Sequence, residues 1–352
     1  MGKPSLILAA LAADALPNMR FSQVQDISDP QEELITQLLT GADGEFVIFK
    51  SPKSNKALTS LGFEIRALRA LKKLHLPFKV PSLLGETSPT ALYKAFAFDF
   101  IAGDAIDLSR LKTDDLLVTA IAETLAQIHS IPVDLVVAAG LPEYDPALRN
   151  RERVASFDRA METGRIHPSL LERWQNALLD VNLFRYQPTT VHGAMNSSSL
   201  MAQGNSIVGV NNWSQLAVDD PALDLAGLFS ECQVEMANAI FLAYEGFIRA
   251  DRNLKQRANL YFELSYASYL LWAMESADEN HISEAEKLVT GLHSDLAQGL
   301  LPSLAPTELA SNVSEVVTPI SQAASFTSPI NIVTEQIEVV DLEPTAKPEE
   351  EN

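Results

Sequence analysis

The feature that most constrains the fold is a change of hydrophobic pattern near residue 102. Before it, apolar runs of strand length stand at 46–49 and 95–101, and the turn dipeptide Asp43-Gly44 precedes the first run. One intervening segment, 59–71, instead has apolar residues at helical spacing. We therefore predict a mixed sheet with one helix over residues 1–102.

After residue 102 the pattern becomes mostly helical. The sequence Thr113-Asp114-Asp115 is a typical helix start. Further helices are predicted near 169–182, 221–247, 253–276 and 283–299. A short hairpin, marked by the turn dipeptide Gly204-Asn205, interrupts them within 190–213. Residues 103–302 are thus predicted to form a helical lobe, which makes the chain a two-lobed α/β (α+β) protein.

The composition changes in the C-terminal segment, 303–352. This segment holds nine carboxylates against one lysine, a large share of the formal net charge of −20. Its Ser, Thr, Pro and Glu content cannot bury enough apolar surface to offset chain entropy, so we predict a disordered acidic tail. The stretch 330–342 is rich in Ile and Val and is the part expected to bind a protein partner.

Charge and cysteine content restrict partners and location. With 26 basic against 46 acidic residues, no nucleic-acid partner is expected, because phosphate backbones are bound by clustered Lys and Arg. The N-terminal apolar run 5–11 is too short to span a bilayer, and a secretory signal is its less favoured interpretation. Cys232, the one cysteine, cannot form an internal disulfide and lies in a helical-looking run, where a buried inert thiol is expected. We predict a cytoplasmic protein with no membrane partner.

Three motifs, found in one order, indicate a family. Residues 191–201 read V-H-G-A-M-N-S-S-S-L-M, residues 209–214 read G-V-N-N-W-S, and residues 218–226 read V-D-D-P-A-L-D-L-A. They resemble the V-H-G-D-L-x-x-x-N/H-x-L, G-V-I-D-W-S and V-D-D-P-A-x-D-L-A motifs of aminoglycoside and macrolide phosphotransferases, the macrolide 2'-phosphotransferases most of all. Weaker similarity extends over about residues 5–300. The resemblance implies a protein-kinase-like fold that uses ATP and Mg²⁺.

Three positions that carry chemistry in that family differ here. Ala194 replaces the aspartate that accepts or orients the substrate hydroxyl, and the loss of a positioned base typically lowers a rate by about 10²–10⁴-fold. Ser199 stands at a metal-ligand position, and Asn212 replaces the main magnesium carboxylate. Both keep an oxygen without a charge, whereas Mg²⁺ is normally held through carboxylates and phosphates. His192 is expected to hydrogen-bond the backbone, with an acid-base role as the less favoured alternative.

Neighbouring polar residues are an alternative source of the missing groups. The candidates are Asn196, Asn211, Asp219 and Asp220. We favour a structural role for the aspartates Asp219, Asp220 and Asp224, which are expected to cap the following helix and brace the loop.

The N-terminal part contains the residues that would meet a nucleotide. Lys50 resembles the phosphate-binding lysine of the family, and Glu64 its helix partner. Glu64 falls on the apolar face of the 59–71 helix, where an unpaired carboxylate is costly, so we predict an ion pair with Lys50; an exposed lysine and a boundary glutamate are the alternative. Segment 22–35, expected to cover the phosphates, has no glycine and four acidic residues, which predicts weak phosphate binding. The hinge-like segment Phe98-Asp99-Phe100 has backbone groups that suit an adenine.

The function predicted from these departures is that of a pseudoenzyme, a catalytically impaired phosphotransferase homologue that binds a small molecule or a protein in its cleft, or has a regulatory role. An active or weakly active ATP-dependent phosphotransferase is the competing hypothesis, with a small hydroxylated substrate such as a cationic amino sugar. A scaffold whose only working part is the acidic tail is the third.

Overall fold

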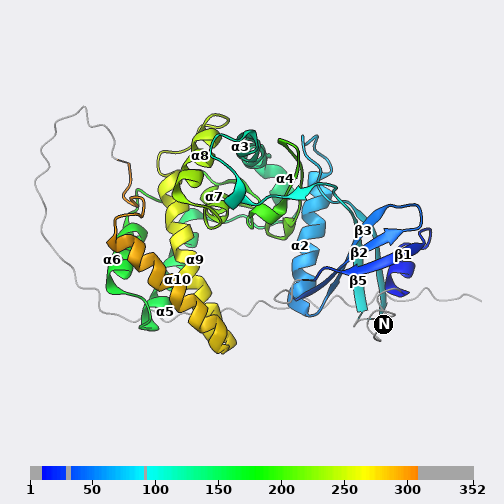
Figure 1. Ribbon diagram of the computed structural model, residues 1–352, viewed down its shortest axis with the longest axis horizontal. Helices are drawn as coiled ribbons and strands as arrows, with labels where there is room; N and C mark the ends of the chain where they lie inside the picture. Colours follow the sequence, from blue (N-terminus) through cyan, green and yellow to red (C-terminus); the bar gives the residue numbers. More distant parts are fainter. Residues whose placement is uncertain (1–9, 29–32, 91–92, 308–352) are drawn as a thin grey trace, which may run out of the picture. The chain divides into compact units, whose positions relative to one another are not determined.

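The computed structural model describes residues 10–28, 33–90 and 93–307 (Figure 1). The chain divides into two compact units, 1–307 and 308–352, and the described residues all belong to the first. The predicted tail with its apolar stretch 330–342, and most of the N-terminal run 5–11, lie outside the described residues.

Five strands form one antiparallel sheet in the described residues. Their spatial order is β1-β2-β3-β5-β4, and their bounds are β1 Phe21–Asp26, β2 Leu34–Gly41, β3 Phe46–Pro52, β4 Leu83–Thr90 and β5 Tyr93–Asp99. The turn between β2 and β3 contains Gly44 at φ +88°, a conformation that glycine adopts without strain. The hairpin predicted at Asp43-Gly44 is therefore confirmed.

The two faces of the sheet pack against different elements. Val47, Phe49 and Ala97 are buried together with residues of a helical turn at 10–15. On the other side of the sheet lies helix α2, Asn55–Leu71, which Figure 1 shows beside the strands. The helix begins four residues earlier than its apolar spacing predicts, because the Ser54 side chain accepts the backbone N–H of Ala57 as an N-cap.

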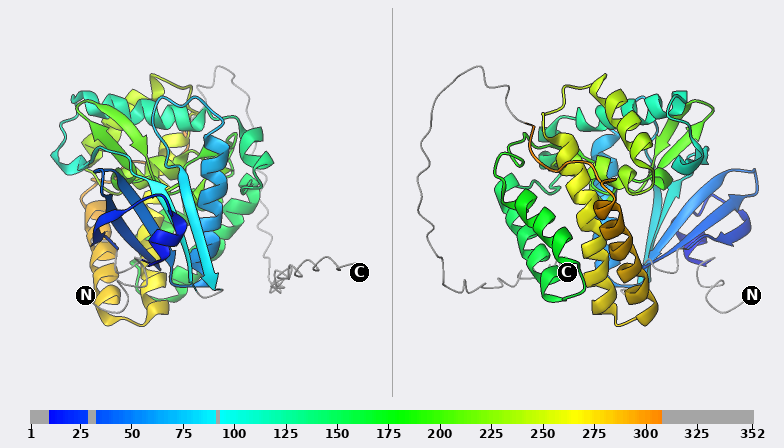
Figure 2. Two further views of the ribbon diagram at one scale, coloured as in Figure 1. Left: turned by 90° about the vertical axis from the view of Figure 1, so that its right-hand side faces the viewer. Right: turned by 60° about the vertical axis from the view of Figure 1, so that its left-hand side comes forward.

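Helices make up most of the remainder. Their bounds are α3 Leu116–His129, α4 Val133–Ala138, α5 Pro146–Glu162, α6 Pro168–Leu179, α7 Ala222–Phe229, α8 Val234–Glu245, α9 Leu254–Ser276 and α10 Glu279–Ala297. Helix α9 packs against α7, α5 and α10, and Figure 2 shows α9 and α10 side by side. Among the described residues, none of the helices combines the length and the apolar character needed to cross a membrane.

The predicted helix 221–247 is two helices in the structure. Helix α7 ends at Phe229 and α8 begins at Val234. Cys232, which we expected inside a helix, lies in the turn between them and is half-buried. Burial and the neighbouring Glu231 raise the pKa of its thiol to about 11, as expected for an unreactive cysteine.

Two small sheets hold the loops that carry the family motifs. Strand β7 (Thr189–Val191) pairs with β10 (Ala217–Asp219). In the second sheet β8 (Leu200–Gln203) lies between β6 (Asp104–Ala105) and β9 (Ser206–Val210). The hairpin predicted around Gly204-Asn205 is therefore present. The single-turn helices η2 (Ser197–Ser199) and η3 (Trp213–Gln215) lie within the connecting loops.

Candidate functional site

The loop after β7 is held by one buried carboxylate. Asp224, on α7, accepts the backbone N–H of His192 at 2.7 Å and that of Gly193 at 2.8 Å. Its Oδ2 also lies 3.1 Å from Nε2 of His129, whose Nδ1 lies 2.8 Å from the Tyr244 hydroxyl. Burial raises the pKa of Asp224, but the hydrogen bond and charge of His129 outweigh it and leave the pKa below its usual value. The bracing role expected for Asp224 is present.

Gly193 allows the loop to pass close to the η3 segment. Its φ is +81°, and a Cβ built there would lie 2.2 Å from the carbonyl oxygen of Gln215. A side chain at this position would both clash and be strained.

His192 makes the backbone hydrogen bond that we predicted. Its Nε2–H donates to the carbonyl oxygen of Asn211 at 2.7 Å, and its ring packs edge-on against Trp213, with centroids 4.7 Å apart. The buried Nδ1 has no hydrogen-bond partner among the described residues. Burial holds the pKa of His192 below 6.5, so the ring is neutral at pH 7.

Asn212 and Ser199, the two positions predicted to be altered metal ligands, lie next to each other. The Asn212 Nδ2 group donates to Ser199 Oγ at 3.4 Å, and Ser199 Oγ in turn donates to Asn196 Oδ1 at 2.8 Å. Asn212 has φ +65°, in the left-handed region that Asn tolerates better than most residues. Ala194, in the same loop as Ser199, is exposed and has no polar side-chain atom.

Three of the four alternative polar residues are already bound elsewhere, whereas Asn211 lines the cavity that holds Asn212. Asn196 caps η2 through the Ser199 backbone N–H. Asp219 pairs with Arg149 at 2.8 Å, and Asp220 pairs with Arg257 at 2.7 Å and caps the Ala222 N–H at 3.0 Å. Neither aspartate lines the cavity that holds Asn212. The structural role that we favoured for them is therefore present.

Lys50 and Glu64 form the predicted ion pair. The Lys50 ammonium lies 2.9 Å and 3.0 Å from the two carboxylate oxygens of Glu64, which is buried on α2. The ammonium also lies 5.3 Å from the centroid of the Phe98 ring. These contacts fix Lys50, on β3, against both α2 and β5.

A cavity of about 180 Å³ brings the predicted nucleotide residues together. Its walls include Lys50, Glu64, Phe98, Asp99, Phe100, Asn211 and Asn212. His192, Ala194 and Ser199 do not line it. The backbone N–H of Asp99 already donates to Ser82 O at 3.0 Å, so this group is not free for an adenine.

The donors in this cavity do not suit Mg²⁺. Within the described ranges, no group of three or more His, Cys, Asp and Glu residues is placed to hold a metal ion. The carboxylate of Glu64 is paired with Lys50, and that of Asp99 accepts the backbone N–H of Ser82. With the neutral Asn212 and Ser199, the site lacks the free carboxylate that this cation usually requires.

Two acidic residues of the predicted phosphate loop are engaged locally. Asp26 accepts the backbone N–H and the hydroxyl of Ser28, at 2.9 and 2.6 Å. Glu33 accepts the hydroxyl of Ser54, the N-cap of α2, at 2.5 Å. The other two, Asp29 and Glu32, lie outside the described residues.

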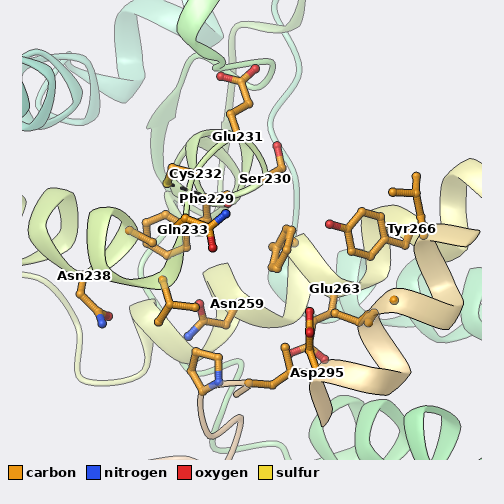
Figure 3. A pocket seen from close by; sticks show the side chains of 18 of the residues that line it. Phe229, Ser230, Glu231, Cys232, Gln233, Asn238, Asn259, Glu263, Tyr266 and Asp295 are labelled. Atoms are coloured by element: carbon orange, nitrogen blue, oxygen red, sulfur yellow. Dashed lines mark hydrogen bonds between the residues drawn. The ribbon is translucent and has the colours of Figure 1, made fainter. Parts of the chain in front are cut away.

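A larger cavity, of about 520 Å³, was not predicted from the sequence (Figure 3). Residues from the α7–α8 turn, α8, α9, α10 and the segment 301–302 line it. The aromatic residues Phe229, Phe262 and Tyr266 form part of its wall. Its volume falls within the range typical of small-molecule sites.

The charged residues of this cavity are mostly acidic. Glu231, Glu263 and Asp295 line it together with one cation, Lys287. Glu263 is neutralised by Arg173, at 2.7 and 2.9 Å. Asn259 is only 7% exposed, yet its side chain makes no hydrogen bond to any described residue.

Glu231 connects this cavity to the motif loop. Its carboxylate accepts the backbone N–H of Ser197, in η2, at 2.8 Å. A ligand in the cavity would therefore lie close to the loop that contains Ala194. The sequence offered no signal for this site, because its residues are scattered over 229–302.

Solved structures share this fold. A macrolide 2'-phosphotransferase from Brachybacterium faecium, as apoenzyme, is 20% identical with a TM-score of 0.66, and the match covers 80% of this chain and 97% of that one. A type I macrolide 2'-phosphotransferase is 22% identical with a TM-score of 0.69, covering 82% and 98%. The GDP and kanamycin complex of the aminoglycoside phosphotransferase APH(2")-IIia is 18% identical with a TM-score of 0.69, covering 83% and 99%.

These similarities confirm the two-lobed, kinase-like α+β fold; the lobe boundary near residue 102 stays a prediction.

Among curated protein sequences, none matches the chain. The protein-family model for the "Phosphotransferase enzyme family" matches residues 24–257, which is more than half of the chain. This protein therefore belongs to the phosphotransferase enzyme family that includes the aminoglycoside and macrolide phosphotransferases.

Proposed function

We propose that this chain is a catalytically impaired member of its family that acts as a small-molecule binding module. The observation that carries the proposal is the contact between Asn212 and Ser199, whose loop also contains Ala194. The positions that hold a base and metal ligands in the family here hold a methyl group and two neutral side chains. Phosphoryl transfer depends on positioning and on metal-ion charge, so the loss of these groups removes most of its catalysis.

The binding capacity rests on the 520 Å³ cavity. Asn259 lines the cavity, and its side-chain amide makes no hydrogen bond to a described residue, so it is available to a ligand. The aromatic wall and the carboxylates of Glu231 and Asp295 favour an organic cation with apolar and hydroxyl groups. The relatives' names, which mention macrolide and kanamycin, support the same ligand class.

A nucleotide is the second ligand that we propose. The intact Lys50–Glu64 pair supports phosphate contact, and the GDP complex of a relative supports nucleotide binding in this fold. Because the Mg²⁺ ligands are missing, we infer that Mg²⁺ adds little to nucleotide affinity. The competing function, a weakly active ATP-dependent phosphotransferase, is favoured only by the intact ion pair.

Thermal-shift titrations test both ligands. Kanamycin or a macrolide is expected to raise the melting temperature, because a ligand of the folded state stabilises by about 2.7 kcal/mol at a hundred times its Kd. Asp295→Asn is expected to reduce this shift, and the matched change Asp158→Asn, on an exposed residue of α5 outside the cavity, to leave it unchanged. Equal shifts in the two variants would contradict the proposed ligand position.

ATP is titrated with and without Mg²⁺, alongside an assay for phosphate transfer to the same cations. We expect stabilisation that Mg²⁺ does not increase, and no transfer. A magnesium-dependent shift accompanied by turnover would establish the competing enzyme function.

A further inference from the structure

A third cavity, of about 310 Å³, lies on another side of helix α2. Lys56, Thr59, Ser60 and Phe63 of α2 form one wall. The opposite walls come from Pro142, Tyr144, Arg149, the motif-loop residue Gly193 and the segment 214–217. It shares no lining residue with the cavity that contains Lys50 and Glu64, nor with the 520 Å³ cavity.

The charges in this cavity favour an anion. Asp219 is the one carboxylate in its lining, and Arg149 pairs with it at 2.8 Å and with Glu152, outside the lining, at 3.0 Å. Lys56 is exposed and forms no ion pair with a described residue. The Lys56 ammonium is therefore the one charge in the lining that no carboxylate of the described residues pairs with.

Residues with hydrogen-bond donors share the lining with Lys56. The side-chain hydroxyls of Ser60, Tyr144 and Ser214 line the cavity and make no hydrogen bond to a described residue. The Arg149 guanidinium is held over the Tyr144 ring, 3.9 Å from its centroid, so both side chains are fixed in place. Hydroxyl donors and an unpaired ammonium in one cavity suit the oxygens of a phosphate or carboxylate group.

We propose that this cavity binds a small hydroxylated organic anion, such as a phosphate monoester, and that the bound anion restrains α2 against the motif loop. Helix α2 packs against η3, and it carries Glu64 toward Lys50. The anion would contact α2, Gly193 and the segment after Asn212 at once. Through these contacts it holds in place the elements that form the neighbouring cleft. The site does not depend on whether the protein transfers phosphate.

Calorimetric titration with glycerol 3-phosphate at constant ionic strength tests the proposal, with glycerol as the uncharged control. We expect binding of the phosphate ester alone. Lys56→Gln removes a charge-assisted hydrogen bond and is expected to weaken the binding of glycerol 3-phosphate roughly tenfold. Lys72→Gln, at the exposed C-terminal end of the same helix, is expected to leave it unchanged.

Hydrogen exchange locates the ligand independently. Bound glycerol 3-phosphate should slow exchange of the backbone amides in 56–63 and 214–217. The absence of binding, equal weakening by the two lysine changes, or protection confined to 98–101 and 211–212 would overturn the proposal. The last outcome would place the phosphate in the nucleotide cleft.

Discussion

The side chain of Asp224 accepts the backbone N–H of His192 at 2.7 Å, so the motif loop takes its shape from a helix more than thirty residues away in sequence. The carboxylate is fully buried and also contacts Gly193 and His129. One side chain therefore satisfies the hydrogen bonds of several buried groups. Asp224 therefore has a structural role as a charged hydrogen-bond acceptor, and this role does not depend on catalysis.

Asp224→Asn is expected to destabilise the protein. An amide offers one acceptor oxygen and directs an N–H₂ group at donors, which leaves at least one buried group unsatisfied at a cost of about 1–3 kcal/mol. Urea unfolding measures the loss. Asp158→Asn, an exposed change in α5, is the control and should alter the free energy of unfolding little. Equal stability of the two variants would show that the loop does not depend on this carboxylate.

Mild acid is expected to destabilise the protein through His192. Burial lowers its pKa in the folded state below 6.5, so the unfolded chain binds the proton first as the pH falls. Stability is therefore lost progressively from about pH 6.5 downward, a higher range than the one in which Asp224, whose pKa lies below 3.8, contributes. Melting temperatures measured from pH 7.5 to 5 should fall less steeply in His192→Gln. Parallel curves would show that the charge of this ring does not oppose folding.

Lys50→Met is expected to destabilise the protein by about 3–5 kcal/mol, because it leaves the Glu64 carboxylate buried without a counter-charge. The double variant Lys50→Met with Glu64→Met should recover much of that loss. A double-mutant cycle on free energies of unfolding separates the coupling from the two single effects. Additive losses would mean that the pair contributes nothing as a pair.

Simultaneous Ala194→Asp, Ser199→Asn and Asn212→Asp changes restore the family's groups. If the impairment is confined to these positions, magnesium-dependent phosphate transfer should appear, whereas each single change should remain inactive because the groups act as a unit. Circular dichroism controls for folding. A folded but silent triple variant would show that the phosphate loop or the acceptor pocket is also altered.

Sequence patterns predicted those elements whose apolar residues face one core. Helix α2 and the β2–β3 hairpin have such patterns, whereas α5 was missed because Phe157 and Ala160 are its only buried residues. Helix α4 is too short for a periodic signal. The break after Phe229 was missed because the turn contains no glycine or proline to mark it.

The candidate site also contains residues that the sequence predicted and residues that it did not. Residues inside contiguous motifs, such as His192 and Asn212, were identified from local sequence, and the Lys50–Glu64 pair followed from the cost of burying a lone carboxylate. The 520 Å³ cavity was not identified from the sequence, because residues from four helices, the α7–α8 turn and the segment 301–302 form its wall. Its decisive feature, the unpartnered Asn259, depends on which side chains surround it and so cannot be read from neighbours in sequence.

The contact between Gly193 and Gln215 shows that the motif contains a residue required for steric reasons as well as residues required for chemistry. Glycine is required there because two backbone segments cross with no room for a Cβ, a demand that persists when the next residue has lost its acid. A homologue without catalysis is therefore under the same steric constraint as an active one. The glycine therefore reflects the path of the backbone, whereas the residue that follows it bears on the reaction.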